Sequence, residues 1–495
     1  MNLITLEIAV VILAIAVLLG DLWTPAPHKR KLGYAAAGGL ILVFIYSFLA
    51  TPAPGLAFNN MFVMDGLALF FKRFFLVAAI MVIFIAIEFA DRIETGISEF
   101  YSLILFALTG MMFAASANDF VLVFVSLELI SVTFYVLNSF QRNRLASLEA
   151  GIKYLILSAL SAAFLVFGIA FIFGTTTFTN FSEIKSLLTR SPEFVTQPLF
   201  LLGILFVMVG LGFKIAAFPF QIWAPDVYQG SPAPATAFLA IGSKAAGIIL
   251  LLRVLFTAVP QVALHWEKLL IAISAITILY GNLCAIPQRN LKRLLGYSSI
   301  ANAGYLLLGF AALNQPGFSA ILYYLSGYLF TVLTAFMVIS IVTRGRESED
   351  ISVLAGLNQR SPLLATLLTL AMVSLAGIPP LAGFFGKFLL LKAVVEQGAN
   401  NSAYYWLVGI ALVGVVISLY YYFGVIRAIY WSREPADLSQ IPVSIAARIV
   451  LLVCAAGMLY LGILPDKAVK QTQLAVQVLQ ITSPAVEIQK EARHP

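Results

Sequence analysis

Two apolar stretches that contain proline decide the fold: GFKIAAFPF at residues 212–220 and SLAGIPPLAGFFGKF at residues 374–388. Each lies inside an apolar run long enough to cross a bilayer, which takes about 20 helical residues. A proline inside a helix removes the hydrogen bond that the carbonyl four residues earlier would accept. We therefore expect two membrane-spanning helices that are broken. The carbonyls freed in this way belong to Ile215 (by Pro219), Leu375 (by Pro379) and Ala376 (by Pro380).

The overall composition indicates that the solvent around this chain is largely lipid. Apolar residues make up 61% of the 495 residues and charged residues only 11%, whereas soluble domains carry roughly 25% charged residues. So few charges cannot cover a core of this size with a water-facing surface. The sequence therefore predicts an all-α polytopic membrane protein.

Apolar runs of spanning length recur along the whole chain and predict about fourteen transmembrane helices. The first run, residues 3–19, has no basic region before it and no small-residue cleavage site after it, so we interpret it as a span and not as a signal peptide. The predicted spans are 3–20, 33–50, 67–89, 100–117, 119–138, 151–174, 199–222, 232–257, 267–286, 294–313, 319–343, 362–397, 403–431 and 445–464.

Basic residues give the predicted helices an orientation. Lys and Arg are concentrated in the cytoplasmic loops of membrane proteins, and an N-terminus outside leaves only Lys185 and Arg190 in outer loops. We therefore expect a multi-pass protein of a bacterial inner membrane, in which the net charge of +7 sets topology and binds no nucleic acid. The cytoplasmic cations in this arrangement are Lys29, Arg30, Lys31, Arg92, Arg142, Arg144, Arg289, Lys292, Arg293, Arg344, Arg346, Arg360 and Arg433.

The two broken helices occupy matching places in the predicted order of spans. Each is the fourth helix of a five-helix stretch, and an odd number of spans per unit forces the second unit into inverted topology. Interrupted helices in inverted repeats indicate an ion pathway near the midplane, although proline also simply kinks transmembrane helices. We predict a three-helix segment at 1–99, repeats at 100–257 and 258–431, and a final span with a tail at 432–495.

Five ionisable residues fall inside predicted spans, where a charge costs at least ~2.5–3.5 kcal/mol. Glu128, Lys214, Lys244 and Lys387 lie well inside, and Lys153 lies nearer the cytoplasmic end. Burial and an opposite charge act on the proton affinity of a lysine in opposite directions, so a partner that moves can switch its charge. A row of such residues passes protons through intervening water. The structural alternative is a static ion pair such as Glu128 with Lys214, but no mid-membrane acid remains for Lys244 or Lys387.

The other polar residues in predicted spans have simpler interpretations. Four cations near helix ends are expected to extend their charged groups to the interface, and two acids at the inner end of the third span are expected to face water. Hydroxyl side chains on the eleventh span either line a water chain or form ordinary helix–helix contacts. These sets are Lys72, Arg73, Arg253 and Lys392; Glu88 and Asp91; and Tyr323, Tyr324, Ser326, Tyr328, Thr331 and Thr334.

Cysteine and histidine are too few for redox cofactors. The chain has two cysteines, which cannot supply the ligands of an iron–sulfur cluster. Its three histidines fall in predicted loops or in the tail, so none is expected to ligate haem inside the membrane. A glycine-rich phosphate loop is absent as well. We expect this chain to bind no cofactor, so that any electrons travel in other subunits.

Three motifs resemble the antiporter-like membrane subunits of respiratory NADH–quinone oxidoreductase (complex I). They are GFKIAAFPFQIWAPDVYQGSPAPATAFLA at residues 212–240, NLKRLLGYSSIANAGYLLLG at 290–309 and GIPPLAGFFGKF at 377–388. The wider family includes subunits of multisubunit cation/proton antiporters. Within it, PDVYQGSP at 225–232 and the lysine at position 387 are similar to the N type, and the lack of a long lateral helix separates the chain from the L type.

The resemblance implies roles that the residues alone do not establish. It implies a translocase subunit in which Glu128 and Lys214 form a modulating pair, Lys244 is the central relay and Lys387 exchanges protons in a second half-channel. Neighbouring antiporter-like and small membrane subunits are the implied partners, and NADH, flavin, iron–sulfur clusters and quinone are expected in other subunits. The alternatives are a subunit of a cation/proton antiporter and a membrane scaffold that transports nothing.

Overall fold

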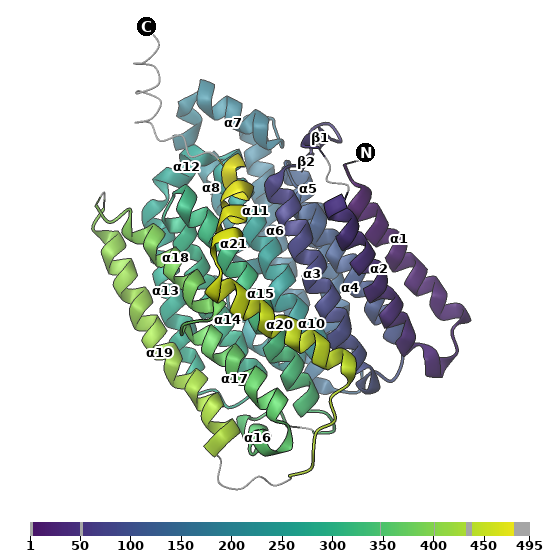
Figure 1. Ribbon diagram of the computed structural model, residues 1–495. Helices are drawn as coiled ribbons and strands as arrows, with labels where there is room; N and C mark the ends of the chain where they lie inside the picture. Colours follow the sequence, from purple (N-terminus) through teal and green to yellow (C-terminus); the bar gives the residue numbers. More distant parts are fainter. Residues whose placement is uncertain (1–2, 50–52, 347, 400, 432–437, 480–495) are drawn as a thin grey trace.

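The computed structural model describes residues 3–49, 53–346, 348–399, 401–431 and 438–479. Within these residues it is a bundle of long helices with one short two-stranded sheet (Figure 1). Thirteen described helical stretches are long and apolar enough to cross a membrane. The predicted all-helical membrane fold is thus confirmed, with thirteen candidate spans in place of fourteen. Arg433 and the tail beyond residue 479, including His494, lie outside the described residues.

The described helices and strands follow one another along the chain as listed here. They are α1 (Thr5–Trp23), η1 (Ala26–His28), α2 (Arg30–Leu49), β1 (Gly55–Ala57), β2 (Phe62–Met64), α3 (Gly66–Phe89), η2 (Ala90–Arg92), α4 (Ile97–Ala115), α5 (Phe120–Asn138), α6 (Leu145–Thr176), α7 (Phe181–Arg190), η3 (Pro192–Thr196), α8 (Pro198–Ile215), α9 (Trp223–Gly230), α10 (Ala233–Phe238), η4 (Leu239–Ser243), α11 (Lys244–Arg253), η5 (Val254–Ala258), α12 (Pro260–His265), α13 (Glu267–Ala285), α14 (Leu291–Ala311), α15 (Gln315–Val342), η6 (Ile351–Leu354), α16 (Leu357–Arg360), α17 (Pro362–Ala376), α18 (Ala382–Val395), α19 (Ala403–Trp431), α20 (Ile445–Ile463), α21 (Asp466–Ala475) and η7 (Val476–Val478). Strands β1 and β2 pair antiparallel.

The difference of one span arises at the second predicted break. Residues 362–397, predicted as one span, form two shorter helices, α17 and α18. Helix α17 ends at Ala376 and α8 ends at Ile215, so both helices stop where proline leaves a carbonyl without its donor. A left-handed residue follows each end, Ala216 in the first break and Gly377 in the second. Beyond the first break the chain resumes as the short helix α9, in a segment predicted to be a connection.

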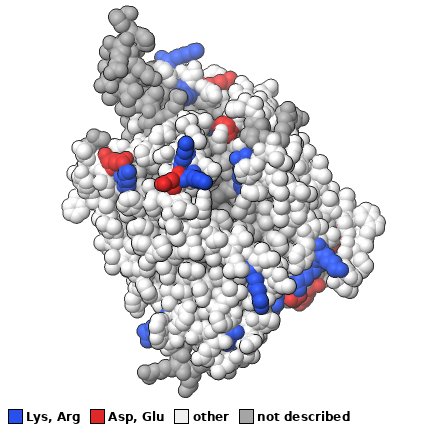
Figure 2. Space-filling model, viewed as in Figure 1, with Lys and Arg blue, Asp and Glu red and all other residues white. Residues whose placement is uncertain are grey.

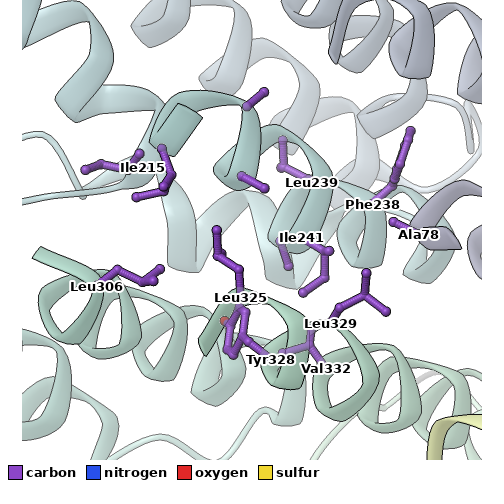
Figure 3. Close-up of a cluster of buried hydrophobic side chains, with 14 of the residues drawn as sticks. Ala78, Ile215, Phe238, Leu239, Ile241, Leu306, Leu325, Tyr328, Leu329 and Val332 are labelled. Carbon is purple, nitrogen blue, oxygen red and sulfur yellow. The ribbon is translucent and has the colours of Figure 1, made fainter. Parts of the chain in front are cut away.

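The middle of the bundle is a span whose whole length is buried. Residues 233–258 run as α10, the π-helical turn η4, α11 and a second π-helical turn, η5. Figure 3 shows part of this packing, in which Leu239 and Ile241 of η4 belong to a cluster of buried side chains that includes Leu325 of α15. Helices α1 and α2 form one flank of the bundle and α19 the opposite flank (Figure 1). Any polar group on the central span is therefore shielded from lipid by other helices.

Charged side chains are unevenly distributed over the molecular surface. On the face drawn in Figure 2 they gather toward two ends, and few lie in the belt between them. One of these ends holds α7 and the start of α1, and the other holds α16 (Figure 1). Such an apolar belt is what contact with the hydrocarbon core of a bilayer requires.

Candidate proton-relay site

Lys214 stands in the last turn of α8, directly before the first break. It is 5% exposed. Its ammonium group donates to Ser131 Oγ at 2.7 Å and to the hydroxyls of Tyr154 and Ser158 at 3.3 Å each. Helix α11 approaches closely at Gly247, where an added Cβ would lie 3.1 Å from Lys214 Cβ. The lysine is thus enclosed by hydroxyl groups from α5 and α6 and lies against the helix that carries the next lysine.

Lys244 is the first residue of α11 and follows the π-helical turn η4. It is 2% exposed. Its ammonium group donates to the backbone carbonyl of Ser299 at 2.6 Å and also to the Ser299 hydroxyl. That hydroxyl lies 3.1 Å from the hydroxyl of Tyr228. Since π-helical turns often occur at functional sites, the turn beside Lys244 agrees with a role beyond packing.

Lys387 lies on α18, beyond the second break, and is buried. Its ammonium group donates to the carbonyl of Leu375 at 2.7 Å, which is one of the carbonyls that the sequence predicts to be freed by proline. The same group lies 4.6 Å from the centre of the Tyr305 ring. Helix α18 passes so close to α17 that a Cβ added at Gly383 would lie 1.8 Å from Ser374 O. Only glycine fits there, and its close approach brings Lys387 to the end of α17.

These three ammonium groups share one property, which is that their described partners are all neutral. No carboxylate in the described part of the chain lies within ion-pair distance of any of them; they are held by hydroxyls and carbonyls instead. Other buried cations do have acid partners, in the pairs Lys72–Glu7 at 2.7 Å, Arg253–Asp65 at 2.9 Å and Lys292–Glu349 at 3.0 Å. The static ion pair therefore accounts for the second set of cations and not for the first.

Two of these ion pairs show that part of the expectation about helix ends is wrong. Lys72 and Arg253 do not extend to the interface but are 0% and 2% exposed, because each finds an acid on another segment. Lys392 does extend outward, with its side chain 60% exposed. Glu88 is likewise buried between two arginines and does not face water, whereas Asp91 is exposed as expected.

Glu128 and Lys153 occupy different surroundings from the three buried lysines. Glu128 is half-buried on α5, and among the described residues no ion pair joins it to Lys214. Lys214 instead contacts Ser131, one turn further along the same helix. The Lys153 side chain is 41% exposed and pairs at 2.7 Å with both Glu149 and Asp226. Lys153 therefore lies at the edge of the bundle, outside the buried set.

Comparison with known proteins places this arrangement in a family. The family model described as NADH:quinone oxidoreductase/Mrp antiporter, transmembrane, matches residues 117–418. The NADH-quinone oxidoreductase subunit N of Desulforamulus reducens is 38% identical over 475 residues, which cover 96% of this chain and 98% of that protein. The protein of the same name from Trichlorobacter lovleyi is 39% identical over 97% of each chain. The chain belongs to the NADH-quinone oxidoreductase subunit N family.

Solved structures with the same fold support the assignment to the subunit N family. A chain in the structure of respiratory complex I from Thermus thermophilus with bound aureothin is 33% identical. It superposes with a TM-score of 0.79 and covers 94% of this chain and 99% of its own length. A chain of the Mrp complex from Dietzia has a TM-score of 0.81 at 19% identity, which shows a shared fold alone.

A row of polar side chains in this subunit N family member continues from Lys244 beyond Ser299. The Tyr324 hydroxyl donates to Asn302 Oδ1 at 2.6 Å, and Asn302 Nδ2 donates to Ser298 Oγ at 3.4 Å. Ser298 Oγ and the hydroxyl of Tyr422 lie 2.5 Å apart. Sequence reasoning missed these residues, although Ser298, Asn302 and Tyr305 recur at i, i+4 and i+7 and so share one face of α14.

The hydroxyl side chains of the eleventh predicted span, now α15, divide into two groups. Tyr324 joins the polar row, and Tyr328 stacks beside it with ring centroids 6.1 Å apart. The other four form ordinary helix contacts, since each bonds a carbonyl of its own helix or of α20; they are Tyr323, Ser326, Thr331 and Thr334. The water-chain interpretation thus narrows to two residues of six.

The chemistry of the site rests on amines, hydroxyls and amides. Within the described residues no group of three or more His, Cys, Asp or Glu side chains is placed to hold a metal ion. A hydroxyl donates one hydrogen bond and accepts others, so a chain of hydroxyls between amines can hand a proton from one amine to the next. The arrangement therefore suits proton transfer.

Proposed function

We propose that this chain is the proton-translocating membrane subunit N of a respiratory NADH–quinone oxidoreductase, and that Lys214, Lys244 and Lys387 relay the protons. The observation that carries the proposal is the set of neutral partners around three buried ammonium groups. A buried charge costs several kcal/mol unless it is paired. Three lysines kept in this costly state are explained by a cycle in which each alternates between charged and neutral.

Glu128 is the proposed modulator of the first lysine. Its carboxylate forms no described ion pair with Lys214, while Ser131, on the same helix as Glu128, holds the ammonium group. A shift that brought Glu128 into contact would favour the charged lysine, and a shift away would favour release of the proton. The hydroxyls around Lys214 make this exchange feasible because they hold the amine in either state.

The direction of transport follows from the basic loops. Their placement favours the cytoplasm at the end of the bundle that holds Asp226 and Lys292, with the N-terminus outside. We propose that protons enter at this end near Lys153 and leave on the other side beyond Lys387. In this scheme residues 100–257 and 258–431 act as two inverted halves, each with one broken helix. NADH, flavin, iron–sulfur clusters and quinone would reside in partner subunits, with lipid and neighbouring membrane subunits around this chain.

The two alternative functions differ in what supports them. A cation/proton antiporter subunit shares the family model, but the relatives with 37–40% identity carry the name subunit N, whereas the Mrp chain is 19% identical. A scaffold without transport would have no use for buried lysines that lack acid partners. Both considerations favour the oxidoreductase pump.

The test compares two lysines on one helix. Lys387→Met removes the buried amine of α18, and Lys392→Met removes an exposed amine one and a half turns further along. Membranes with equal amounts of assembled complex are assayed for NADH–quinone reductase rate and for protons pumped per NADH. We expect Lys387→Met, and likewise Lys214→Met and Lys244→Met, to lose pumping while Lys392→Met behaves as wild type. Normal pumping in all three relay variants would favour the scaffold.

A further inference from the structure

A cavity of about 870 Å³ opens between the ends of α13, α14 and α19. It lies at the end of the bundle that carries the basic loops, since its walls include Gln288 and Leu294 beside Arg289, Lys292 and Arg293. Tyr421 forms part of its inner wall, and Arg427 is another lining residue. The lining contains no acid. The cavity is separate from Lys153 and Asp226, which belong to α6 and α9.

A chain of described contacts leads from this cavity into the bundle. The Tyr421 hydroxyl donates to Asn282 Oδ1 at 2.9 Å, and the Tyr421 ring lies against the ring of Tyr422 with centroids 4.4 Å apart. Both tyrosines and Asn282 are buried. The Tyr422 hydroxyl then meets Ser298 Oγ at 2.5 Å. Side chains of α13, α14 and α19 therefore connect the cavity wall with the polar row.

The inner end of this chain lies on α14, the helix that also contacts two relay lysines. Ser298 is followed by Ser299, whose carbonyl and hydroxyl hold Lys244. On the same helix, Tyr305 places its ring against Lys387, and its hydroxyl donates to a carbonyl of α19 at 3.0 Å. Lys214 takes no part in these contacts, because its partners belong to α5 and α6. The chain thus bypasses the first lysine.

We propose that this cavity is a second proton entry, which loads Lys244 and Lys387 from the same side of the membrane without passing through Lys214. This inference rests on the proposed relay. The Tyr421 hydroxyl accepts a proton from water in the cavity and releases its own, which intervening water carries to the Tyr422 hydroxyl. Tyr422 exchanges a proton with Ser298. Intervening water also links Ser298 to Ser299, because the side chains of consecutive helical residues do not face each other. A neutral Lys244 amine accepts the last proton, so one proton enters and one is delivered. Asn282 and Asn302 orient the hydroxyls and carry no proton.

The charge of the cavity wall suits protons better than metal cations. Arg427 is the one ionisable Lys, Arg, Asp or Glu side chain among the lining residues, and a fixed positive charge repels sodium and potassium ions. Proton exchange along hydrogen bonds requires no ion to pass the arginine. The entry is therefore selective by electrostatics as well as by size.

The experiment blocks the entry in two independent ways. Tyr422→Phe removes the hydroxyl that meets Ser298, and Gly424→Leu fills the cavity, because no atom lies within 4 Å of an added Cβ at Gly424. The matched control is Tyr405→Phe, which alters a 53% exposed tyrosine of α19 that does not line the cavity. Each variant is assayed in the assembled complex for reductase rate and for protons pumped per NADH.

We expect Tyr422→Phe and Gly424→Leu to lower the number of protons pumped per NADH, because a positioned proton-transfer group speeds its step by ~10²-fold, and we expect Tyr405→Phe to match wild type. Normal proton yield in both blocked variants would overturn the second entry, even if Lys244→Met abolishes pumping and so upholds the relay itself. Normal yield in Lys244→Met as well would refute the relay. If Tyr422→Phe fails to assemble, Gly424→Leu decides the question.

Discussion

The buried ion pair between Lys72 and Glu7 provides a direct test of the distinction between paired and unpaired charges. The side chains are 0% and 1% exposed and the ammonium lies 2.7 Å from the carboxylate, so solvent screens neither. Lys72→Met would leave Glu7 buried without a partner, because apart from the Lys72 ammonium its carboxylate oxygens have no hydrogen-bond donor in the described structure. Breaking such a pair costs about 3–5 kcal/mol. Each 1.4 kcal/mol changes an equilibrium constant tenfold. The equilibrium constant for packing α1 against the rest of the bundle should therefore fall by about two to three and a half powers of ten.

The double variant Glu7→Leu with Lys72→Met separates structure from function. Replacing both members of a buried pair by apolar groups is often neutral or stabilising by about 1–4 kcal/mol, so we expect assembly to recover. The assays are the amount of complex on native gels, its thermal stability in detergent, and protons pumped per NADH. The single variant Lys72→Met should lower the amount of assembled complex, but the complex that does assemble should pump the normal number of protons per NADH. A double variant that assembles fully but does not pump would refute the reasoning, because a paired charge would then belong to the relay.

Two further predictions concern the close helix contact and the exposed ion network. Gly383→Ala should push α17 away from α18 and lower the free energy of unfolding by about 1–3 kcal/mol. It should also reduce pumping, because Lys387 moves away from the Leu375 carbonyl. The control is Gly409→Ala, whose added Cβ meets no atom within 4 Å, and both variants are assayed for pumping in the assembled complex. At Asp226, burial opposes ionisation, but hydrogen bonds from a lysine and an arginine outweigh it and lower the pKa. Its stabilisation is therefore complete above the ordinary value near pH 4 and is lost as the pH falls through the lowered pKa. Asp226→Asn should cost up to about 1 kcal/mol of stability at pH 7 and progressively less as the pH falls below the ordinary value. Thermal denaturation at neutral and at acidic pH checks this, and an equal cost at both would contradict it.

Sequence reasoning located the buried lysines because the free-energy cost of placing a charge in an apolar segment depends on the neighbouring sequence alone. Lys214, Lys244 and Lys387 each lie in an apolar run where any charge is expensive, and that can be read without knowing the fold. The helix ends at Ile215 and Ala376 were predictable for the same reason, since proline acts on the carbonyl four residues before it. Local chemistry was sufficient for these features.

Partners that come from distant segments could not be predicted in this way. Lys72 was expected to reach the interface because it lies near a helix start, but Glu7 is 65 positions earlier, on a helix that is otherwise largely exposed in the described structure. The polar row could not be predicted for the same reason, because Tyr422 and Ser298 come into contact only when α19 packs against α14. Sequence alone gave the helical spacing on α14 but not which helix would face it.

The broken helices explain how a buried lysine can be positioned by a polar partner and still release its proton. Lys214 lies in the last turn of α8, and the Lys387 ammonium group contacts a carbonyl of the last turn of α17. A helix C-terminus carries a partial negative charge of about half a unit, which orients an ammonium group but attracts it less than a carboxylate does. When the amine loses its proton, no full negative charge is left unpaired inside the membrane. In an ion pair, by contrast, the carboxylate would be left as an unpaired charge. At the second break proline thus supplies a dipole of moderate strength, and Lys387 contacts it with an ammonium group that can both take up and release a proton.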